Sequence, residues 1–190
     1  TRHMPGIDEF QGHIGPTYRE SEAWWPRPAS APSGAPNILF IVLDDVGFSD
    51  LGCFGSEIPT PRMDALAAGG LRYNNFHVTS MCSPTRAALL TGRNAHAVGV
   101  GAIAEWSNGF PGYQGHITRH AATVAEMLSD HAYGTYAVGK WHLSNLANYG
   151  AAGPHEQWPL GRGFSRWYGF LGGYVDHWNP DLHEDNHPIR

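Results

Sequence analysis

The sequence has few cysteines, few basic residues and no hydrophobic run long enough to cross a membrane. Its two cysteines, Cys53 and Cys82, form neither a CxxC pair nor a zinc-type spacing, which argues against a disulfide scaffold or a zinc site. The 12 Lys and Arg residues are outnumbered by 17 Asp and Glu, and the formal net charge is -5, so a nucleic-acid partner is not expected. A membrane partner is not expected either, because a spanning helix needs about 20 mostly apolar residues.

Residues 1–36 form a region without periodicity that is rich in Pro, Ala and Ser near its end. This composition predicts an irregular leader ahead of one folded unit over residues 37–190. The adjacent Trp24 and Trp25 are expected to pin the leader onto the body or a partner. The N-terminus has no hydrophobic signal core, from which we expect a cytoplasmic location.

Strand patterns alternate with helix patterns after the leader. A continuous apolar run over 38–43 is typical of a central parallel strand that is covered on both faces. The alternation as a whole predicts an α/β fold with a doubly wound, mostly parallel sheet. The predicted strands cover residues 38–43, 71–78 and 135–143, and the predicted helices cover residues 60–70, 83–91 and 121–134.

Two carboxylates, Asp44 and Asp45, directly follow the apolar run. In an open α/β sheet the carboxyl ends of the strands form the edge where ligands bind. Neighbouring carboxylates repel each other unless a cation neutralises them, and Ca2+ or Mg2+ is the natural partner. A solvated turn after a strand is an equally good interpretation of these two residues alone.

The segment from Cys82 to Arg93 combines a cysteine, a helix start and an arginine one turn later. If one helix covers Cys82 and Arg86, their side chains share a face, near the N–H groups that favour an anion. A reactive thiolate is one interpretation, but neither His77 nor His96 lies in a motif that supports a base. A buried structural cysteine is the simpler alternative.

A third group, Lys140 and His142, lies at the end of another predicted strand. Alternate residues of an extended segment point to the same side, so both side chains are expected to act together. An ammonium and an imidazole suit an oxyanion, one by charge and the other by proton donation. Polar residues facing water at a strand end are the alternative.

Four segments carry familiar motifs in one order along residues 36–173. They are PNILFIVLDDVGFSDLGCFG (36–55), CSPTR followed by TGR (82–93), GKWHL (139–143) and GRGFSRWYGFLGG (161–173). Together they resemble the type I sulfatases, the formylglycine-dependent arylsulfatases of the alkaline phosphatase superfamily. CSPTR matches their Cys-x-Pro-x-Arg signature, while Ser165 stands where Asp is common.

The resemblance implies a modified cysteine and a metal. In this family the signature cysteine, here Cys82, is oxidised to formylglycine by a formylglycine-generating enzyme. Its hydrate attacks the sulfur of a small-molecule sulfate ester, the alcohol or phenol leaves, and sulfate is then expelled. Asp44, Asp45 and the modified Cys82 would bind Ca2+, with Mg2+ as the alternative.

The resemblance also assigns roles to three cationic or titratable residues. Arg86 would stabilise the hydrated aldehyde. Lys140 would contact the sulfate group. His142 would contact the hydrate or the sulfate oxygens and take the proton of the second hydroxyl, which assists release of sulfate.

Later parts of the family pattern do not occur in the chain. A further Asp-Asn or Asp-Gln metal pair, another histidine and a lysine lie well downstream in the family, and "DNH" at 185–187 comes too early to be assigned to them. The chain is therefore expected to be the N-terminal part of a sulfatase catalytic domain. With so few carboxylates, this piece alone is expected to bind metal weakly and to have little activity.

Two other functions remain open at this point. The chain could belong to a phosphoester or phosphonate hydrolase of the same superfamily, or it could be an inactive truncated fragment with an interaction role. The sequence does not identify the natural ester. Trp106, Phe110 and Tyr113 could wall an aromatic-binding pocket, although ordinary loop packing is the simpler interpretation.

Overall fold

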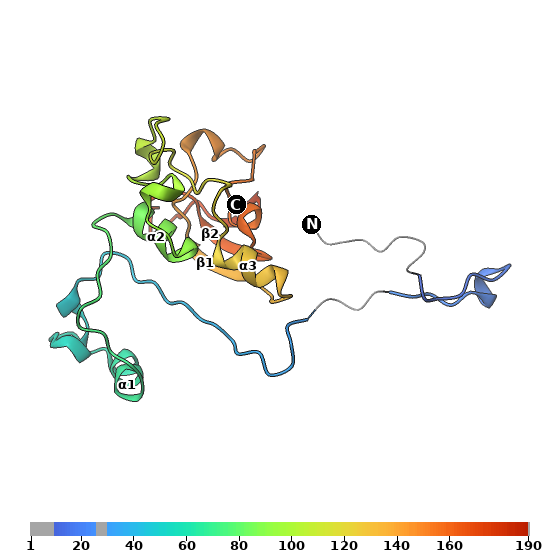
Figure 1. The fold of residues 1–190 in the computed structure, drawn as a ribbon, viewed down its shortest axis with the longest axis horizontal. Helices are drawn as coiled ribbons and strands as arrows, with labels where there is room; N and C mark the ends of the chain where they lie inside the picture. The colour runs from blue at the N-terminus through green and yellow to red at the C-terminus, as the bar shows by residue number, and fades with distance from the viewer. Residues whose placement is uncertain (1–9, 26–29, 190) are drawn as a thin grey trace.

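The computed structural model describes residues 10–25 and 30–189, and the later part of the chain folds into a compact body (Figure 1). Every buried residue of the described ranges lies between Ser83 and His183. Residues 37–80 run outside the body as an arm that carries the first α-helix. In the described ranges, no helix is both long and apolar enough to span a bilayer.

The body combines short helices with a mixed sheet, in agreement with the predicted α/β class. Strands β1 and β2 pair in parallel, and β3 and β4 are added antiparallel, in the sheet order β1-β2-β3-β4. One strand pair thus provides the parallel part of the described sheet. The elements are α1 (Pro61–Gly69), α2 (Cys82–Thr91), α3 (Val124–Asp130), β1 (Tyr136–Lys140), β2 (Arg166–Phe170), β3 (His183–Glu184) and β4 (His187–Pro188).

The predicted strand over 38–43 is wrong for this structure. The segment belongs to the arm, has no strand assignment, and its apolar side chains are 42% to 81% exposed. An apolar run favours an extended chain, but a strand also needs a neighbour that supplies hydrogen bonds, and this segment has none in the described ranges. The predicted strand over 71–78 is not formed either.

The expected pinning of the leader is also not seen in the described residues. Trp25 is 84% exposed, and Trp24 packs edge-on against Phe10 within the leader itself, with ring centroids 6.1 Å apart. Two adjacent tryptophans therefore do not by themselves specify a contact with the body.

The helices follow the sequence prediction more closely. α1 has Pro61 in its first turn, but the Thr60 side chain does not cap it; the Thr60 hydroxyl donates to Asp64 instead, at 2.9 Å. α3 begins with a capping box, in which Thr123 and Glu126 each accept a hydrogen bond from the backbone N–H of the other.

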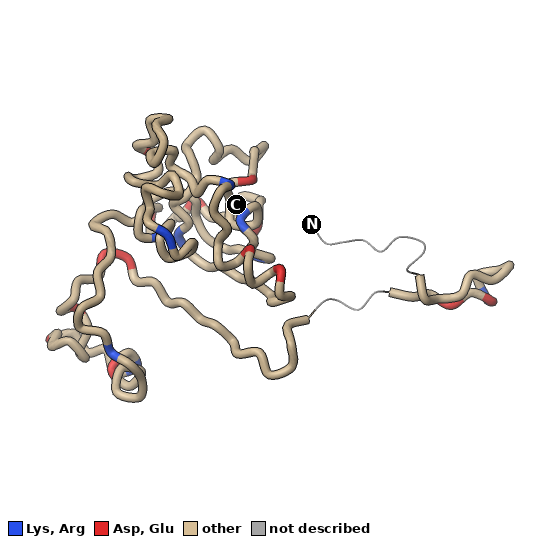
Figure 2. The backbone as a smooth tube through the Cα atoms, viewed as in Figure 1, with Lys and Arg blue, Asp and Glu red and all other residues tan. Residues whose placement is uncertain are grey.

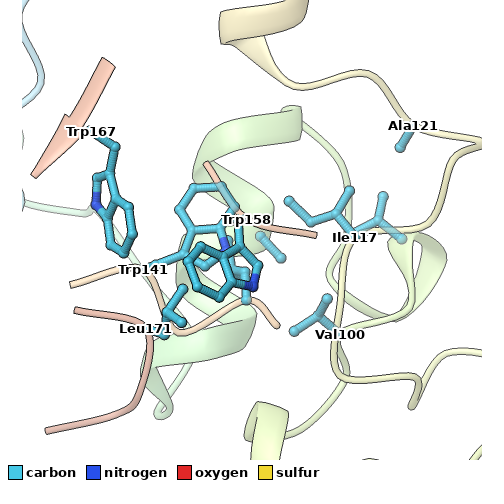
Figure 3. Close-up of a cluster of buried hydrophobic side chains, with 10 residues drawn as sticks. Val100, Ile117, Ala121, Trp141, Trp158, Trp167 and Leu171 are labelled. Atoms are coloured by element: carbon cyan, nitrogen blue, oxygen red, sulfur yellow. The ribbon is translucent and has the colours of Figure 1, made fainter. Parts of the chain in front are cut away.

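The core lies beside the sheet and is rich in tryptophan (Figure 3). Trp141, Trp158 and Trp167 are all buried, and the rings of the last two meet edge to face with centroids 6.3 Å apart. Their indole N–H groups all have partners: Trp158 donates to the Asn148 carbonyl at 2.6 Å and Trp141 to that of Gln157 at 2.8 Å. Because Trp141 follows β1 directly, the core fixes where that strand ends.

A buried arginine joins α3 to the body. Arg162 is 2% exposed and donates to the carbonyls of Ile117 and Ala121 and to the carboxylate of Glu126, the last at 3.1 Å. Arg119 also approaches Glu126, at 4.0 Å, but its side chain is 62% exposed. The two arginines therefore provide a buried and an exposed partner for one carboxylate.

Replacing Arg162 should be far more damaging than replacing Arg119. Arg162→Met leaves two buried carbonyls without this donor and Glu126 without its buried cationic partner, and we expect the free energy of unfolding to fall by about 3 kcal/mol. Arg119→Met, the matched control, should change it by less than about 0.5 kcal/mol, because an exposed ion pair contributes little. Urea unfolding followed by tryptophan fluorescence measures both; equal losses would contradict this assignment.

His183 is enclosed by aromatic rings. It stacks on Trp167 with ring centroids 5.9 Å apart and meets Trp158 edge-on at 5.1 Å. Burial lowers the pKa of His183 below its ordinary value of 6.5; Asp181 opposes this effect and His155 adds to it. The folded protein therefore binds a proton at His183 less readily than the unfolded chain does.

This difference makes stability depend on pH. Because the folded pKa lies below 6.5, protonation of His183 favours the unfolded chain. The free energy of unfolding therefore has its full value above pH 6.5 and decreases as the pH falls from 6.5 toward the folded pKa. His183→Gln should reduce the slope of unfolding free energy against pH, by at most about 1.4 kcal/mol per pH unit. His187→Gln, at an exposed position in β4, should leave that slope unchanged.

Candidate active site

Helix α2 brings the cysteine and the arginine of the CSPTR segment to one face. Met81 is the N-cap, so Cys82 is the first helical residue rather than the residue just before the helix. The helix ends at Gly92, whose φ of 65° lies in the left-handed region and whose N–H donates to the Ala88 carbonyl. Cys82 and Arg86 are therefore one turn apart at the N-terminal end of a helix packed into the body.

The segment after β1 brings the second pair of predicted residues beside this helix. Trp141 and His142 extend the parallel pairing by donating to the carbonyls of Phe170 and Leu171, both at 2.9 Å. His142 is 3% exposed and has a φ of 58°, in the left-handed region that few non-glycine residues adopt. The lysine and the histidine then reach different partners at the site.

His142 bridges Cys82 and a carboxylate that the sequence analysis missed. Its Nδ1 lies 3.2 Å from Cys82 Sγ, and its Nε2 lies 2.6 Å from Glu105 Oε2. The histidine beside the cysteine is thus His142; His77 pairs with Asn75 instead. No sequence motif marks Glu105, which lies in a loop turn, and only the folded chain brings it to the site.

Lys140 and Arg86 converge on one carboxylate of the arm. Lys140 Nζ lies 2.8 Å from Asp44 Oδ2, and Arg86 lies 3.8 Å from the same oxygen while also donating to the Lys140 carbonyl at 2.6 Å. Asp44 is thereby joined to the body although the strand before it is not formed. Two cations and one carboxylate leave this part of the site with an excess of positive charge.

The local environment shifts three pKa values. Burial lowers the pKa of Arg86, although nearby anions oppose the shift. Burial also lowers the pKa of His142 below 6.5; the hydrogen bond to Glu105 opposes this, and the charges of Lys140 and Arg86 add to it. Burial alone would raise the pKa of Glu105, but hydrogen bonds from His142 and from backbone N–H groups lower it overall. A neutral imidazole beside an ionised carboxylate follows at neutral pH.

A family model described as Sulfatase matches residues 36–189. The chain belongs to the sulfatase family. Among characterised relatives, the arylsulfatase of Klebsiella aerogenes is 36% identical over 152 residues, which cover 79% of this chain and 31% of that protein. Arylsulfatase A of Homo sapiens is 41% identical over 138 residues, covering 70% and 25%. The resemblance inferred from the sequence is confirmed, and the chain spans about a quarter to a third of these sulfatases.

Similar solved structures agree that this chain forms part of a sulfatase fold. The crystal structure of Ps i-CgsB is similar with a TM-score of 0.59 at 36% identity, covering 72% of this chain and 28% of that one. BT33336S-sulf, from work on glycosaminoglycan metabolism by Bacteroides thetaiotaomicron, gives a TM-score of 0.60 at 28% identity, covering 83% and 32%. The predicted fold class, an incomplete N-terminal portion of the sulfatase α/β fold, is therefore confirmed.

The described residues supply only part of a sulfatase metal site. The carboxylates of Asp44 and Asp45 are hard oxygen donors of the kind that Ca2+ and Mg2+ prefer. However, the part of the chain that the structure describes holds no group of three or more His, Cys, Asp or Glu side chains able to bind a metal. The donors match in kind but are too few for the 6–8 ligands of Ca2+.

Two other sequence features have structural roles. Asp185, in the DNH segment, accepts from the Trp167 backbone N–H at 2.9 Å and pairs with Arg166 at 2.9 Å. Tyr113 packs edge-on against His96, while Trp106 and Phe110 are exposed. An aromatic-binding wall therefore stays a prediction.

Asp44 should weaken anion binding when no metal is present. Because Asp44 lies close to both Lys140 and Arg86, Asp44→Asn should raise the affinity of the metal-free protein for inorganic sulfate about fivefold, as expected for removal of about 1 kcal/mol of repulsion at such distances. Lys140→Met should lower that affinity. The measurement is the shift in melting temperature with sodium sulfate against sodium chloride at equal ionic strength.

Glu57→Gln is the control for this prediction. Glu57 is an exposed carboxylate of the same arm, and its loss changes the net charge by the same amount. It should leave sulfate affinity unchanged. An equal gain in Glu57→Gln and Asp44→Asn would mean that net charge, rather than the contact with the two cations, controls binding.

Proposed function

We propose that the polypeptide containing this chain hydrolyses sulfate esters, aryl sulfates among them, to an alcohol or phenol and sulfate. The single observation that carries the proposal is the convergence of Cys82, Arg86, Lys140 and His142, which come from a helix start and a strand end more than 50 residues apart. Membership of the sulfatase family supports the same chemistry. Sulfate ester hydrolysis of this kind requires a cysteine as precursor, and Cys82 is a partly buried thiol with cationic neighbours.

Cys82 is proposed to act after conversion to formylglycine by a formylglycine-generating enzyme. The hydrated aldehyde would supply the oxygen nucleophile that receives the sulfuryl group. In support of this, the γ atom of residue 82 lies at the N-terminal end of a helix, where free N–H groups favour negative charge. Arg86, on the same helix face, would stabilise charge on an oxygen at that position.

Lys140 and His142 would share the remaining work. Lys140 would bind a sulfate oxygen through its positive charge. Its ammonium group already binds one anionic oxygen, that of the Asp44 carboxylate. His142 Nδ1, at 3.2 Å from the γ atom of residue 82, would accept a proton from an oxygen at that atom and so assist release of sulfate.

A divalent cation completes the proposal. Ca2+, or alternatively Mg2+, would be held by Asp44, Asp45 and the modified residue 82, with further oxygen ligands from elsewhere in the polypeptide. The ion would act as a Lewis acid toward sulfate oxygens. Oδ2 of Asp44 contacts Lys140 at 2.8 Å, so the ion and the ammonium group would share or compete for this carboxylate.

The identity of the ester is a matter for the complete protein. Two of the relatives are named arylsulfatases, and one similar structure, with a TM-score of 0.57 at 34% identity, is Ps i-CgsB in complex with k-i-k-neocarrahexaose. Sulfate esters on aromatic and on sugar hydroxyls are therefore both suitable probes. 4-Nitrophenyl sulfate is the simplest test substrate.

Mass spectrometry and turnover test this proposal together. In the full-length polypeptide co-produced with a formylglycine-generating enzyme, the peptide containing Cys82 should lose about 18 Da, because one sulfur is replaced by oxygen and two hydrogens are lost. The protein should then release sulfate from 4-nitrophenyl sulfate. Cys82→Ala should abolish turnover, and Lys140→Ala should lower kcat/KM about a hundredfold.

Three results would overturn the proposal. One is an unmodified thiol together with full turnover. Another is faster hydrolysis of 4-nitrophenyl phosphate than of the sulfate. The third is turnover that persists in Cys82→Ala.

A further inference from the structure

Glu105 has no role in the site proposed so far, yet it makes the closest contact with His142. Its carboxylate oxygen Oε2 lies 2.6 Å from His142 Nε2, and the Glu105 side chain is three-quarters buried. It lies in the short helical turn η6 (Ala104–Trp106), within a loop between α2 and α3. We propose that Glu105 is a positioning residue that holds His142 with its proton on Nε2 and its bare Nδ1 facing residue 82. The proposal rests on the proposed function, because it assigns a task within that site.

The hydrogen-bond chemistry specifies the tautomer. An ionised carboxylate only accepts, so the nitrogen facing Glu105 must carry the proton. In a neutral imidazole the other nitrogen, Nδ1, is then an acceptor, and it is the one that lies 3.2 Å from Cys82 Sγ. Without the carboxylate, either nitrogen could carry the proton, and the tautomer with Nδ1–H could not take a proton from residue 82.

Glu105 is itself held in place by the CSPTR segment. The backbone N–H of Ala104, its neighbour, donates to Ser83 Oγ at 3.1 Å, and both of these residues are buried. Cys82 and Ser83 are adjacent, so the same stretch of chain carries the reacting position and fixes the turn that bears the carboxylate. The contacts close a ring: Cys82 to His142, His142 to Glu105, and Glu105 through Ala104 back to Ser83.

Further contacts limit how the carboxylate and the ring can move. The hydroxyl of Tyr149 lies 3.5 Å from Glu105 Oε1 and 3.3 Å from the Leu171 carbonyl. Burial, and next the charge of Glu105, raise the pKa of Tyr149, so this hydroxyl stays a donor. On the ring side, a Cβ on Gly173 would lie 2.8 Å from His142 Cε1, so only a glycine leaves room for the imidazole as it is placed.

A positioning role predicts loss of turnover without loss of substrate binding. In the full-length, formylglycine-containing protein, Glu105→Gln should lower kcat for 4-nitrophenyl sulfate about 10–100-fold, the usual effect of removing the carboxylate that orients a functional histidine. KM should change by less than about twofold, because Lys140 and Arg86 remain. Glu105→Asp keeps a carboxylate that only accepts, whereas the Gln amide can also donate and so does not fix the tautomer; Glu105→Asp should therefore recover part of kcat.

The control is Glu156→Gln, an exposed carboxylate of the same body, which should leave both kinetic constants unchanged. Mass spectrometry of residue 82 in each variant distinguishes incomplete conversion of Cys82 to formylglycine from slower turnover of the converted enzyme. A wild-type kcat in Glu105→Gln overturns the inference. Equal kcat in Glu105→Asp and Glu105→Gln also overturns it, because a positioning carboxylate must be partly replaceable by another.

A second measurement decides the case if Glu105→Gln does not fold. In the wild-type protein labelled with 15N-histidine, long-range 1H–15N spectra should show His142, identified by its absence from His142→Gln, as the Nε2–H tautomer. An Nδ1–H tautomer overturns the inference. Failure of the proposed function is distinguishable, because the wild-type protein would then release no sulfate while the tautomer is still observed.

Discussion

The described site depends on one buried imidazole that joins three separate parts of the chain. His142 follows the core strand β1, lies against the first residue of helix α2, and faces the loop turn that carries Glu105. Its left-handed backbone conformation is unfavourable for a histidine and is tolerated where surrounding contacts determine it. If the ring were displaced, the cysteine would lose its neighbour and the carboxylate would lose its closest donor.

The tryptophan core makes this arrangement possible. Trp141 lies between the two functional residues of its segment, and its buried indole prevents that segment from moving as a free loop. The flanking residues therefore project toward α2, where Arg86 donates to the Lys140 carbonyl. Lys and Arg residues lie at separate places along the described chain, on the body and on the arm (Figure 2).

Sequence reasoning was most successful where the signal is local. The helix boundaries around Pro61 and Gly92 depend on nearby residues and were predicted closely, whereas the helix predicted over 121–134 forms only over Val124–Asp130. It failed for residues 38–43, where the apolar pattern predicts burial but the covering partner has to come from distant chain. It also missed Glu105, because a single glutamate in a loop, outside any motif, resembles any solvated surface residue.

The sequence by itself determined the family, the α/β class and the identity of Cys82, Arg86, Lys140 and His142 as candidates, because motifs and periodicity are written in neighbouring residues. Only the tertiary structure decided which of them meet, that His142 is the histidine beside the cysteine, that Asp44 contacts the two cations, and that Glu105 takes part. These outcomes depend on distances between segments about 20 to 100 residues apart, which are set by packing of the whole body rather than by any local pattern.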